Sequence, residues 1–381
     1  MKRLVIQLFD RLAGPVLKAL DKINFRRHPA KVGKILICRL DHIGDVVMTT
    51  PAFNAIKAKF PEAQVFVLSN AAGISILRGN PYVDGYYLFN WPWPYDNKNN
   101  RFTRKHLQDA YRLVREIKKQ QFDLFVDFRG DIRFLLFWGW LTRIPIRLFY
   151  NRMGGRSLAT ASFPHEKGIH EVERVQRTLS VIGVDVPKLR PEVFLSADEC
   201  ASIDLFIKDK NRRYVVVSPF AAKSVKEWRI EHWSKIVGYI QHKFDLDIYI
   251  IGTRENFEKA ELICAENKGS YNICGATSLR QAAALMEKSA MVVGVDTGTL
   301  HIAACFDIPI ISIFGPTDAK QYRPYSPYST VIDLNVCACD KDKHLVCFEN
   351  RSGVASCLDK IAVSMVCNNI DAVISHNFRY A

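Results

Sequence analysis

The sequence has no apolar run long enough to cross a bilayer. Residues 1–31 are the most plausible anchor, but charged residues interrupt them and no small-residue cleavage site follows an apolar core. A membrane-spanning helix needs about 20 consecutive apolar residues, and a secretory signal ends in such a cleavage site. We therefore expect neither feature, and we expect the ten cysteines to be reduced thiols in the cytoplasm.

Several nucleotide-binding and metal-binding patterns are also absent. Neither the G-x-x-x-x-G-K-[ST] loop nor the G-x-G-x-x-G fingerprint occurs, which argues against an ATPase and against an NAD(P)-dependent oxidoreductase. The histidines of "HEKGIH" lie five positions apart, and zinc ligands on one helical face lie four apart. "DLD" at Asp245–Asp247 resembles a carboxylate pair for a divalent ion, but it leads directly into an apolar strand and is interpreted as strand-edge charge.

Acidic residues are in the minority, since 53 Lys and Arg stand against 39 Asp and Glu, a formal net charge of +14. This excess favours an anionic partner such as nucleic acid, a lipid surface or a phosphorylated substrate. Eight of the basic residues lie within residues 1–31, where apolar residues recur at helical spacing. The pattern indicates an amphipathic helix on an anionic membrane surface. A helix packed on the protein itself is the alternative.

Apolar strands alternate with amphipathic helices along the rest of the chain. In the first half we expect strands at Lys34–Arg39, Ala63–Ser69 and Phe122–Phe128, helices at Val46–Phe60, Arg104–Gln120 and Glu171–Ile182, and no regular period over Arg147–His165. In the second half we expect strands within 213–220, 246–252, 290–296 and 308–315, and helices that begin at Ile230, Glu255, Leu279 and Thr299. This order is typical of parallel sheets covered by helices.

We therefore predict an α/β protein with two Rossmann-like, doubly wound domains that face a central cleft. The stretch Gly183–Ser196 has the composition of an interdomain linker. The predicted segments are a basic membrane-surface helix (1–31), an N-terminal domain (32–188), a C-terminal domain (189–358), and a C-terminal helix (359–381) that packs back on the N-terminal domain.

The loop "RLDHIGDVVMTTP" lies between the first strand and its helix. In an open parallel sheet, this is the edge at which ligands bind. Gly44 allows the backbone to turn sharply, and Asp45 lies at the helix start. A simple helix-capping role for Asp45 is the alternative to a chemical one.

The loop "VDTGTLHIAACF" has the same position in the second half. Amides and hydroxyls at such a helix start form a phosphate cradle, here supplied by Asp296, Thr297, Gly298 and Thr299. His301 could reach a diphosphate or ribose, with a packed or capping histidine as the alternative. The loop "SPFAAKSVKEWRIEHW" offers Lys226 to an anion.

Four cysteines near the C-terminus, Cys337, Cys339, Cys347 and Cys357, are a possible zinc set. The first two form C-x-C, whereas structural zinc sites more often use C-x-x-C. Zinc binding, disulfides and free thiols all stay open on this pattern.

Three stretches together resemble glycosyltransferase family 9, the ADP-heptose:lipopolysaccharide heptosyltransferases. They are "ILICRLDHIGDVVMTTPAFNAIKAKFPEAQV", "KEWRIEHW" and "VVGVDTGTLHIAACFDIPIISIFGPTDAKQYRPY", within a similarity over about residues 34–370. The most specific part is D-T-G-x-x-H followed by "FGPT". The resemblance implies a GT-B fold, an acceptor held by the N-terminal domain, a nucleotide sugar held by the C-terminal domain, and inversion at the anomeric carbon without an obligatory metal or other cofactor.

The resemblance also implies roles for individual residues. Asp45 matches the family's general base. Lys226 and the loop from Asp296 to His301 match the groups that stabilise the departing nucleotide diphosphate, and Glu255 matches a nucleotide-facing acidic residue more loosely. Gly44, Arg129 and Arg133 are candidates for acceptor binding.

We expect a glycosyltransferase that moves heptose from ADP-heptose to a lipopolysaccharide core or a related glycolipid. The N-terminal helix would bind the anionic cytoplasmic face of the inner membrane, near a lipid-linked saccharide acceptor, and we expect no nucleic-acid partner. Ala221 and Ala222 replace hydroxyl residues that the family often has. A UDP-sugar donor is therefore one alternative, and a non-catalytic nucleotide-binding module at the membrane is another.

Overall fold

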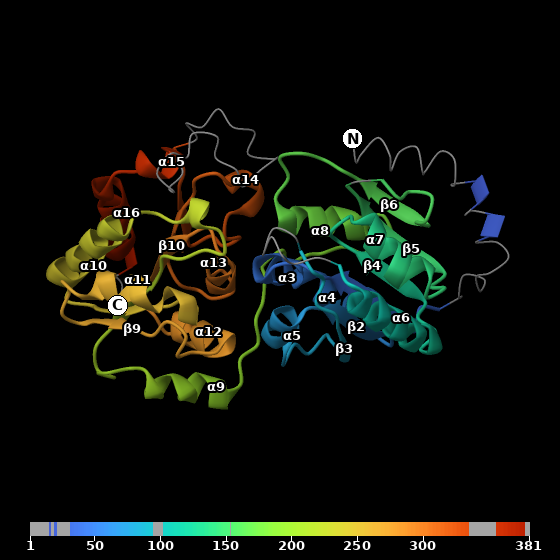
Figure 1. Ribbon diagram of the computed structural model, residues 1–381, viewed down its shortest axis with the longest axis horizontal. Coiled ribbons are helices and arrows are strands. Elements are labelled where there is room, and N and C mark those ends of the chain that lie inside the picture. The colour runs from blue at the N-terminus through green and yellow to red at the C-terminus, as the bar shows by residue number, and fades with distance from the viewer. Residues whose placement is uncertain are drawn as a thin grey trace. The chain divides into compact units, whose positions relative to one another are not determined.

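The computed structural model describes residues 15–16, 19–20, 31–93, 102–152, 154–334 and 356–377. The chain divides into two compact units, Met1–Leu189 and Arg190–Ala381 (Figure 1). Apart from residues 15–16, 19–20 and 31, the segment 1–31 that was predicted as an amphipathic helix lies outside the described residues, and so do Cys337, Cys339 and Cys347. Among the described helices, none combines the length and apolarity that crossing a bilayer requires.

The first unit is built on a parallel sheet of six strands in the order β3-β2-β1-β4-β5-β6. The strands are β1 (Lys34–Arg39), β2 (Gln64–Ser69), β3 (Gly85–Leu88), β4 (Leu124–Asp127), β5 (Ile146–Asn151) and β6 (Ala161–Pro164). The helices are α3 (Ile43–Thr49), α4 (Pro51–Lys59), α5 (Ala71–Leu77), α6 (Arg104–Lys119), α7 (Ile132–Phe134) and α8 (Glu171–Ser180), with a π-helical turn η1 (Leu135–Trp140).

Helices cover both faces of this sheet. Helix α3 contacts α5 and α8, while α6 contacts η1; the doubly wound chain path places these two groups on opposite faces. Because the sheet is covered on both faces, the interiors of its central strands are apolar, and residues 35–38 of β1 are fully buried. The apolar run predicted the strand Lys34–Arg39 with its observed bounds.

The second unit repeats the plan with the strand order β12-β11-β10-β7-β8-β9. Its strands are β7 (Tyr214–Ser218), β8 (Asp247–Ile250), β9 (Ser270–Asn272), β10 (Met291–Val295), β11 (Ile310–Ile313) and β12 (Ser329–Ile332). Its helices are α9 (Ala197–Ser202), α10 (Ile230–Phe244), α11 (Phe257–Cys264), α12 (Leu279–Glu287), α13 (Gly298–Ala303), α14 (Ala319–Tyr322), α15 (Ser356–Asp359) and α16 (Val363–Asn377), with 3₁₀ turns η2 (Ile203–Leu205), η3 (Ser224–Lys226) and η4 (Arg254–Asn256).

Two expectations for the first unit differ from the structure. The single helix expected over Val46–Phe60 is two helices, α3 and α4. Pro51 has no N–H for the carbonyl of Val47, and the hydroxyl of Thr50 donates to that carbonyl instead, over 2.8 Å. The stretch Arg147–His165, expected to lack a period, contains most of β5 and all of β6.

Two differences concern the second unit. The helix expected from Glu255 begins as the 3₁₀ turn η4 and becomes α-helical only at Phe257. The C-terminal helix, expected against the N-terminal domain, packs as α16 on α10 of its own unit. Ile370 and Ile374 join the core there, and the hydroxyl of Tyr239 donates to Asp371 over 2.7 Å.

Candidate active site

In both sheets, the candidate residues lie at the point where the strand order reverses. In the first unit the chain proceeds from β1 to one side of the sheet and then crosses to β4 on the other, and β7 and β10 have the same relation in the second unit. At such a switch point, the loops after two adjacent parallel strands diverge and leave a crevice for a ligand. The loops after β1 and β4, and those after β7 and β10, carry most of the predicted site residues.

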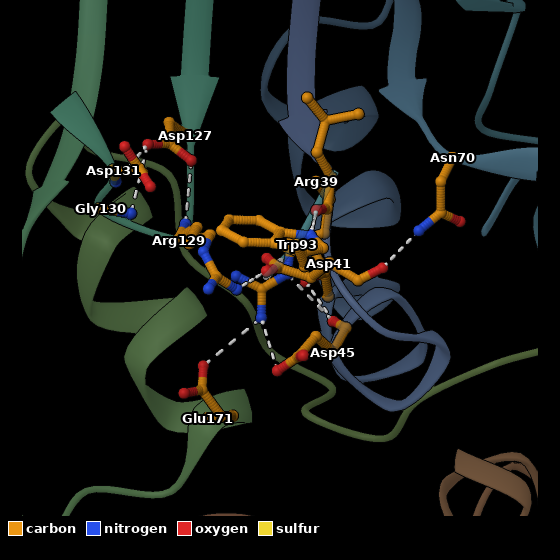
Figure 2. Close-up of polar contacts among 12 residues, drawn as sticks. Arg39, Asp41, Asp45, Asn70, Trp93, Asp127, Arg129, Gly130, Asp131 and Glu171 are labelled. Atoms are coloured by element: carbon orange, nitrogen blue, oxygen red, sulfur yellow. Dashed lines mark hydrogen bonds and ion pairs between the residues drawn. The ribbon is translucent and has the colours of Figure 1, made fainter. Parts of the chain in front are cut away.

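Arg39, the last residue of β1, is the centre of the polar cluster in the first unit (Figure 2). Its Nη2 lies 3.3 Å from Oδ1 of Asp45, and its Nε donates to the carbonyl oxygen of Asp45 over 3.2 Å. Nε also lies 3.3 Å from Oδ2 of Asp41, and Nη2 lies 3.5 Å from Oε2 of Glu171. One guanidinium therefore faces three carboxylates, from the loop after β1, from α3 and from α8.

Asp45 lies in the first turn of α3. Its side chain is 21% exposed, whereas that of Arg39 is only 3% exposed. A hydroxyl group of a ligand can therefore reach Asp45 while the arginine behind it stays dry. Gly44, the other residue singled out in this loop, is buried inside α3.

Arg129 belongs to the same cluster, in the loop after β4. Its guanidinium pairs with Asp41 and lies over the ring of Trp93, with its Cζ 3.9 Å from the ring centroid (Figure 2). The indole of Trp93 donates to the carbonyl of Leu40 over 2.9 Å. The carboxylate of Asp41 and the ring face of Trp93 thus fix the position of the Arg129 guanidinium, and this guanidinium in turn fixes Asp41.

The loop that carries Arg129 is shaped by Asp127. The Asp127 carboxylate accepts from the backbone N–H groups of Arg129 (2.9 Å), Gly130 (3.2 Å) and Asp131 (3.3 Å). Burial raises the pKa of Asp127 to about 7 in spite of these donors. Arg133, the second predicted acceptor contact, pairs with both carboxylate oxygens of Asp131 and has a half-exposed side chain.

Lys226 and Asp296 form the centre of the site in the second unit. Lys226 lies in η3 after β7, and Asp296 follows β10 directly. Lys226 Nζ lies 2.6 Å from Oδ2 of Asp296, with the two side chains 20% and 7% exposed. Burial disfavours the carboxylate, but the adjacent ammonium group outweighs it and holds the pKa of Asp296 below its ordinary value.

The start of α13 lies beside this pair. Thr297 is the N-cap residue, and Gly298 and Thr299 open the first turn. The hydroxyls of Thr299 and Ser218 are 2.6 Å apart, which ties α13 to the end of β7. Gly294 allows that approach, because a Cβ there would lie 2.6 Å from the carbonyl oxygen of Ser218.

His301 and Glu255 have different environments in this unit. His301 is buried on α13, and its charge interaction helps to keep Asp296 ionised. Glu255 lies in η4 after β8, the strand next to β7, and its side chain is exposed. A hydrogen bond with Thr253 lowers the pKa of Glu255. Glu255 therefore shares the sheet edge with Lys226 but has its own local partner.

The sequence patterns singled out the candidate residues at the sheet edges but not the residues that contact them. Asp45, Lys226, Asp296 and Thr299 lie at the predicted edges. Arg39, Asp41 and Glu171, which surround Asp45, were not singled out. A charged residue at the end of the apolar strand "KILICR" was the available signal for Arg39.

Within the described residues, no group of three or more His, Cys, Asp or Glu side chains is arranged to hold a metal ion. Cys357, the one member of the predicted cysteine set among those residues, is buried.

Comparisons with known proteins agree with this architecture. The chain is 26% identical to lipopolysaccharide heptosyltransferase 3 of Escherichia coli K12 over 302 residues, 74% of this chain and 83% of that protein. Its fold is similar to a family 9 glycosyltransferase from Veillonella parvula (TM-score 0.76, 17% identity, 93% of this chain and 99% of that one). It is also similar to the E. coli heptosyltransferase WaaC with ADP (TM-score 0.68, 17% identity, 89% and 99%).

These likenesses confirm the predicted GT-B fold with two Rossmann-like domains. The family model for glycosyltransferase family 9 (heptosyltransferase) matches residues 110–351, more than half of the chain. The chain is therefore a glycosyltransferase and belongs to glycosyltransferase family 9, the heptosyltransferase family.

Proposed function

We propose that this protein transfers heptose from ADP-heptose to a lipopolysaccharide core or a related lipid-linked saccharide. The heptosyltransferase relatives support this choice of sugar and acceptor, and the similarity to WaaC solved with ADP supports the nucleotide. The observation that carries the proposal is the position of the candidate residues at the switch points of the two sheets. A carboxylate lies at one switch point, and a lysine with a helix start lies at the other.

In this proposal the first unit binds the acceptor and the second binds the nucleotide sugar. The acceptor hydroxyl oxygen forms a bond to the anomeric carbon while the bond from that carbon to the diphosphate oxygen breaks. Asp45 takes the hydroxyl proton, and the diphosphate leaves with the electron pair of the broken bond. Attack from the side opposite the leaving group inverts the anomeric carbon.

Lys226 is well suited to stabilise the departing diphosphate. An ammonium group has three N–H donors, and the 2.6 Å bond to Asp296 uses one of them. The others can bond to phosphate oxygens, and Asp296 fixes the nitrogen in place. Thr297, Gly298, Thr299 and His301 supply amides, hydroxyls and a ring nitrogen nearby, and Glu255 lies at the same edge of the sheet.

Arg129 and Arg133 remain the proposed contacts for anionic groups of the acceptor, with Gly44 beside Asp45 at the start of α3. Both guanidiniums already pair with aspartates, Arg129 with Asp41 and Arg133 with Asp131. The half-exposed Arg133 is the more accessible of the two. For residues 1–31 we propose peripheral binding to the anionic cytoplasmic face of the inner membrane, which brings the enzyme to a lipid-linked acceptor.

Calorimetric titration with ADP, UDP and GDP tests the nucleotide site. We expect ADP to bind more tightly than the other two and to bind about 10–100-fold more weakly to Lys226→Ala, since a hydrogen bond to a charged group contributes about 1.5–3 kcal/mol. Lys243→Ala is the matched control. Lys243 lies on α10, and its ammonium nitrogen also pairs with a carboxylate oxygen of an aspartate, Asp371, over 2.7 Å. A preference for UDP would overturn the donor, and no binding of any nucleotide would overturn the proposed function.

A further inference from the structure

The geometry of the first unit points to a role for Arg39. We propose that Arg39 is a positioning residue, which holds Asp45 by its backbone and one carboxylate oxygen and leaves the other oxygen to take the acceptor proton. We further propose that Asp41 and Glu171 hold Arg39 in that pose. The inference rests on the proposed function of Asp45 as the general base, and it adds the residues that prepare this base.

Arg39 contacts Asp45 at two points, its backbone carbonyl and its carboxylate. Nε donates to the backbone carbonyl of Asp45 over 3.2 Å, and Nη2 lies 3.3 Å from Oδ1 of its carboxylate. Within the described part of the chain, Oδ2 of Asp45 has no hydrogen-bond or ion-pair partner. Since the Asp45 side chain is partly exposed, this oxygen is the one a substrate hydroxyl can reach.

Arg39 itself is fixed by two buried carboxylates. Those of Asp41 and Glu171 are 1% and 5% exposed and lie 3.3 and 3.5 Å from its guanidinium. The planar guanidinium presents its donors in a fixed fork. With two carboxylates on that fork, its direction toward Asp45 is set before any substrate binds, as an efficient general base requires.

The carboxylates of Asp41 and Glu171 each pair with a second arginine. Asp41 pairs with Arg129, which lies over the ring of Trp93. Glu171 pairs with Arg174, whose Cζ lies 4.9 Å from the ring centroid of Tyr150. Figure 2 shows the inner part of this arrangement, with Arg39 between Asp41, Asp45 and Glu171.

The charge balance of the cluster also matters for a base. A cation beside a carboxylate favours its ionised form and makes it a weaker proton acceptor. Arg39 shares its single charge among three carboxylates, so Asp45 experiences only part of it. Removing the charge of Glu171 would direct more of the Arg39 charge at Asp45 and weaken it as a base.

Two substitutions separate geometry from charge. Arg39→Lys keeps the charge but loses the fork, and Glu171→Gln keeps the shape but removes the charge. We expect each to lower kcat about tenfold or more, with KM for the donor changed less than about twofold, because the lost interaction acts on the chemical step. Arg177→Gln is the matched control, since Arg177 pairs with Glu166 on the exposed side of the same helix; its kcat should match that of the unaltered protein. Unchanged kcat in both folded variants, or a loss confined to KM, would overturn the inference.

A second measurement needs no turnover. Carbon-13 relaxation of labelled aspartate reports how rigidly the Asp45 carboxyl group is held. The charged groups of the surrounding elements are Lys34 and Arg39 of β1, Asp41 and His42 of the loop, Glu171, Glu173, Arg174 and Arg177 of α8, and Arg129 after β4, whereas α5 carries none. We expect the Asp45 carboxyl group to become more mobile in Arg39→Lys, which loses the two-point contact, and to keep its mobility in Arg177→Gln. Unchanged mobility of this carboxyl group in Arg39→Lys would contradict the inference, whether or not the unaltered protein transfers heptose. A lack of heptose transfer by the unaltered protein would refute the proposed function alone.

Discussion

The ammonium nitrogen of Lys226 lies 2.6 Å from a carboxylate oxygen of Asp296, and the two residues come from loops after the neighbouring strands β7 and β10. The pair is more than a surface ion pair. Asp296 is almost fully buried, so it can stay ionised only with a cation beside it. In the proposed site, the carboxylate fixes the lysine, and the remaining N–H donors of the lysine would bind an anionic ligand.

This division of roles predicts how two substitutions combine. Lys226→Ala should lose ADP affinity and about 1–3 kcal/mol of stability, because it leaves Asp296 buried without its partner. Adding Asp296→Asn removes the buried charge and should recover most of the stability but none of the affinity. Thermal unfolding and calorimetry on the unaltered protein and the two variants measure both quantities. Recovery of ADP binding in the double variant would mean that Lys226 serves only the fold.

A pH dependence of stability follows from Asp127. Burial raises its pKa to about 7 in the folded protein, whereas an unfolded aspartate titrates near 3.9. Between about pH 4 and pH 7 the folded chain therefore keeps a proton that the unfolded chain releases, and stability falls as the pH rises through this window.

Asp127→Asn removes that proton from both states. Relative to the unaltered protein, the variant should gain stability from pH 4.5 to pH 7.5 by at most about 4 kcal/mol. Thermal midpoints of the two proteins, measured in parallel across this range, give the difference in stability. The contributions of other titrating groups are common to both proteins and cancel in this difference. A difference that does not change with pH would show that Asp127 is already ionised throughout.

Two glycines allow a matched test of the Arg129 loop. Gly130 has φ +79°, and a Cβ there would lie 2.2 Å from the carbonyl oxygen of Tyr150. Gly168 has φ +72° with open space around the same position. Both glycine-to-alanine changes incur the backbone cost of about 1–2 kcal/mol, but only Gly130→Ala must also displace neighbouring backbone.

Gly130→Ala should therefore destabilise the protein more than Gly168→Ala does, and it should lower transfer activity by disturbing Arg129. Urea denaturation and rate measurements on the two variants make the comparison. Equal losses would show that the loop after β4 can shift without consequence.

The basic N-terminal segment gives a prediction from sequence alone. Deleting residues 1–31 should reduce sedimentation with vesicles rich in phosphatidylglycerol, because it removes eight cations and an apolar stripe. Neutral phosphatidylcholine vesicles serve as the control for weak apolar binding. Unchanged sedimentation with anionic vesicles would favour a helix that packs on the protein itself.

The strands and helices that sequence patterns predicted well are those with simple periods. Lys34–Arg39 is an apolar run, and the helices from Ile230 and Leu279 begin where expected. Strand β5 was hidden because Arg147 lies in its interior, buried, with its guanidinium donating to the carbonyls of Leu158 and Ile144 over 2.6 and 2.7 Å. A buried charge satisfied by backbone carbonyls interrupts the apolar pattern that would mark a strand.

The candidate site shows the same limit. Asp45, Lys226 and Asp296 stand in short loops between a strand and a helix, so local pattern and family resemblance both point to them. The partners of Arg39 come from different elements, and Glu171 lies far along the chain in α8. Only the folded sheet brings these charges together, and a single sequence does not record that contact.

The most direct test of the proposed activity is the rate of ADP release from ADP-heptose in the presence of a heptose-deficient lipopolysaccharide core, compared between the unaltered protein and Asp45→Asn. We predict steady transfer by the unaltered protein and a rate about 10²–10⁴-fold lower for Asp45→Asn, the usual contribution of a general base. The ADP affinity of Asp45→Asn should equal that of the unaltered protein. Asp109→Asn, on the solvent side of α6, should behave as the unaltered protein. Equal rates for Asp45→Asn and the unaltered protein would contradict the assignment of Asp45 as the catalytic base.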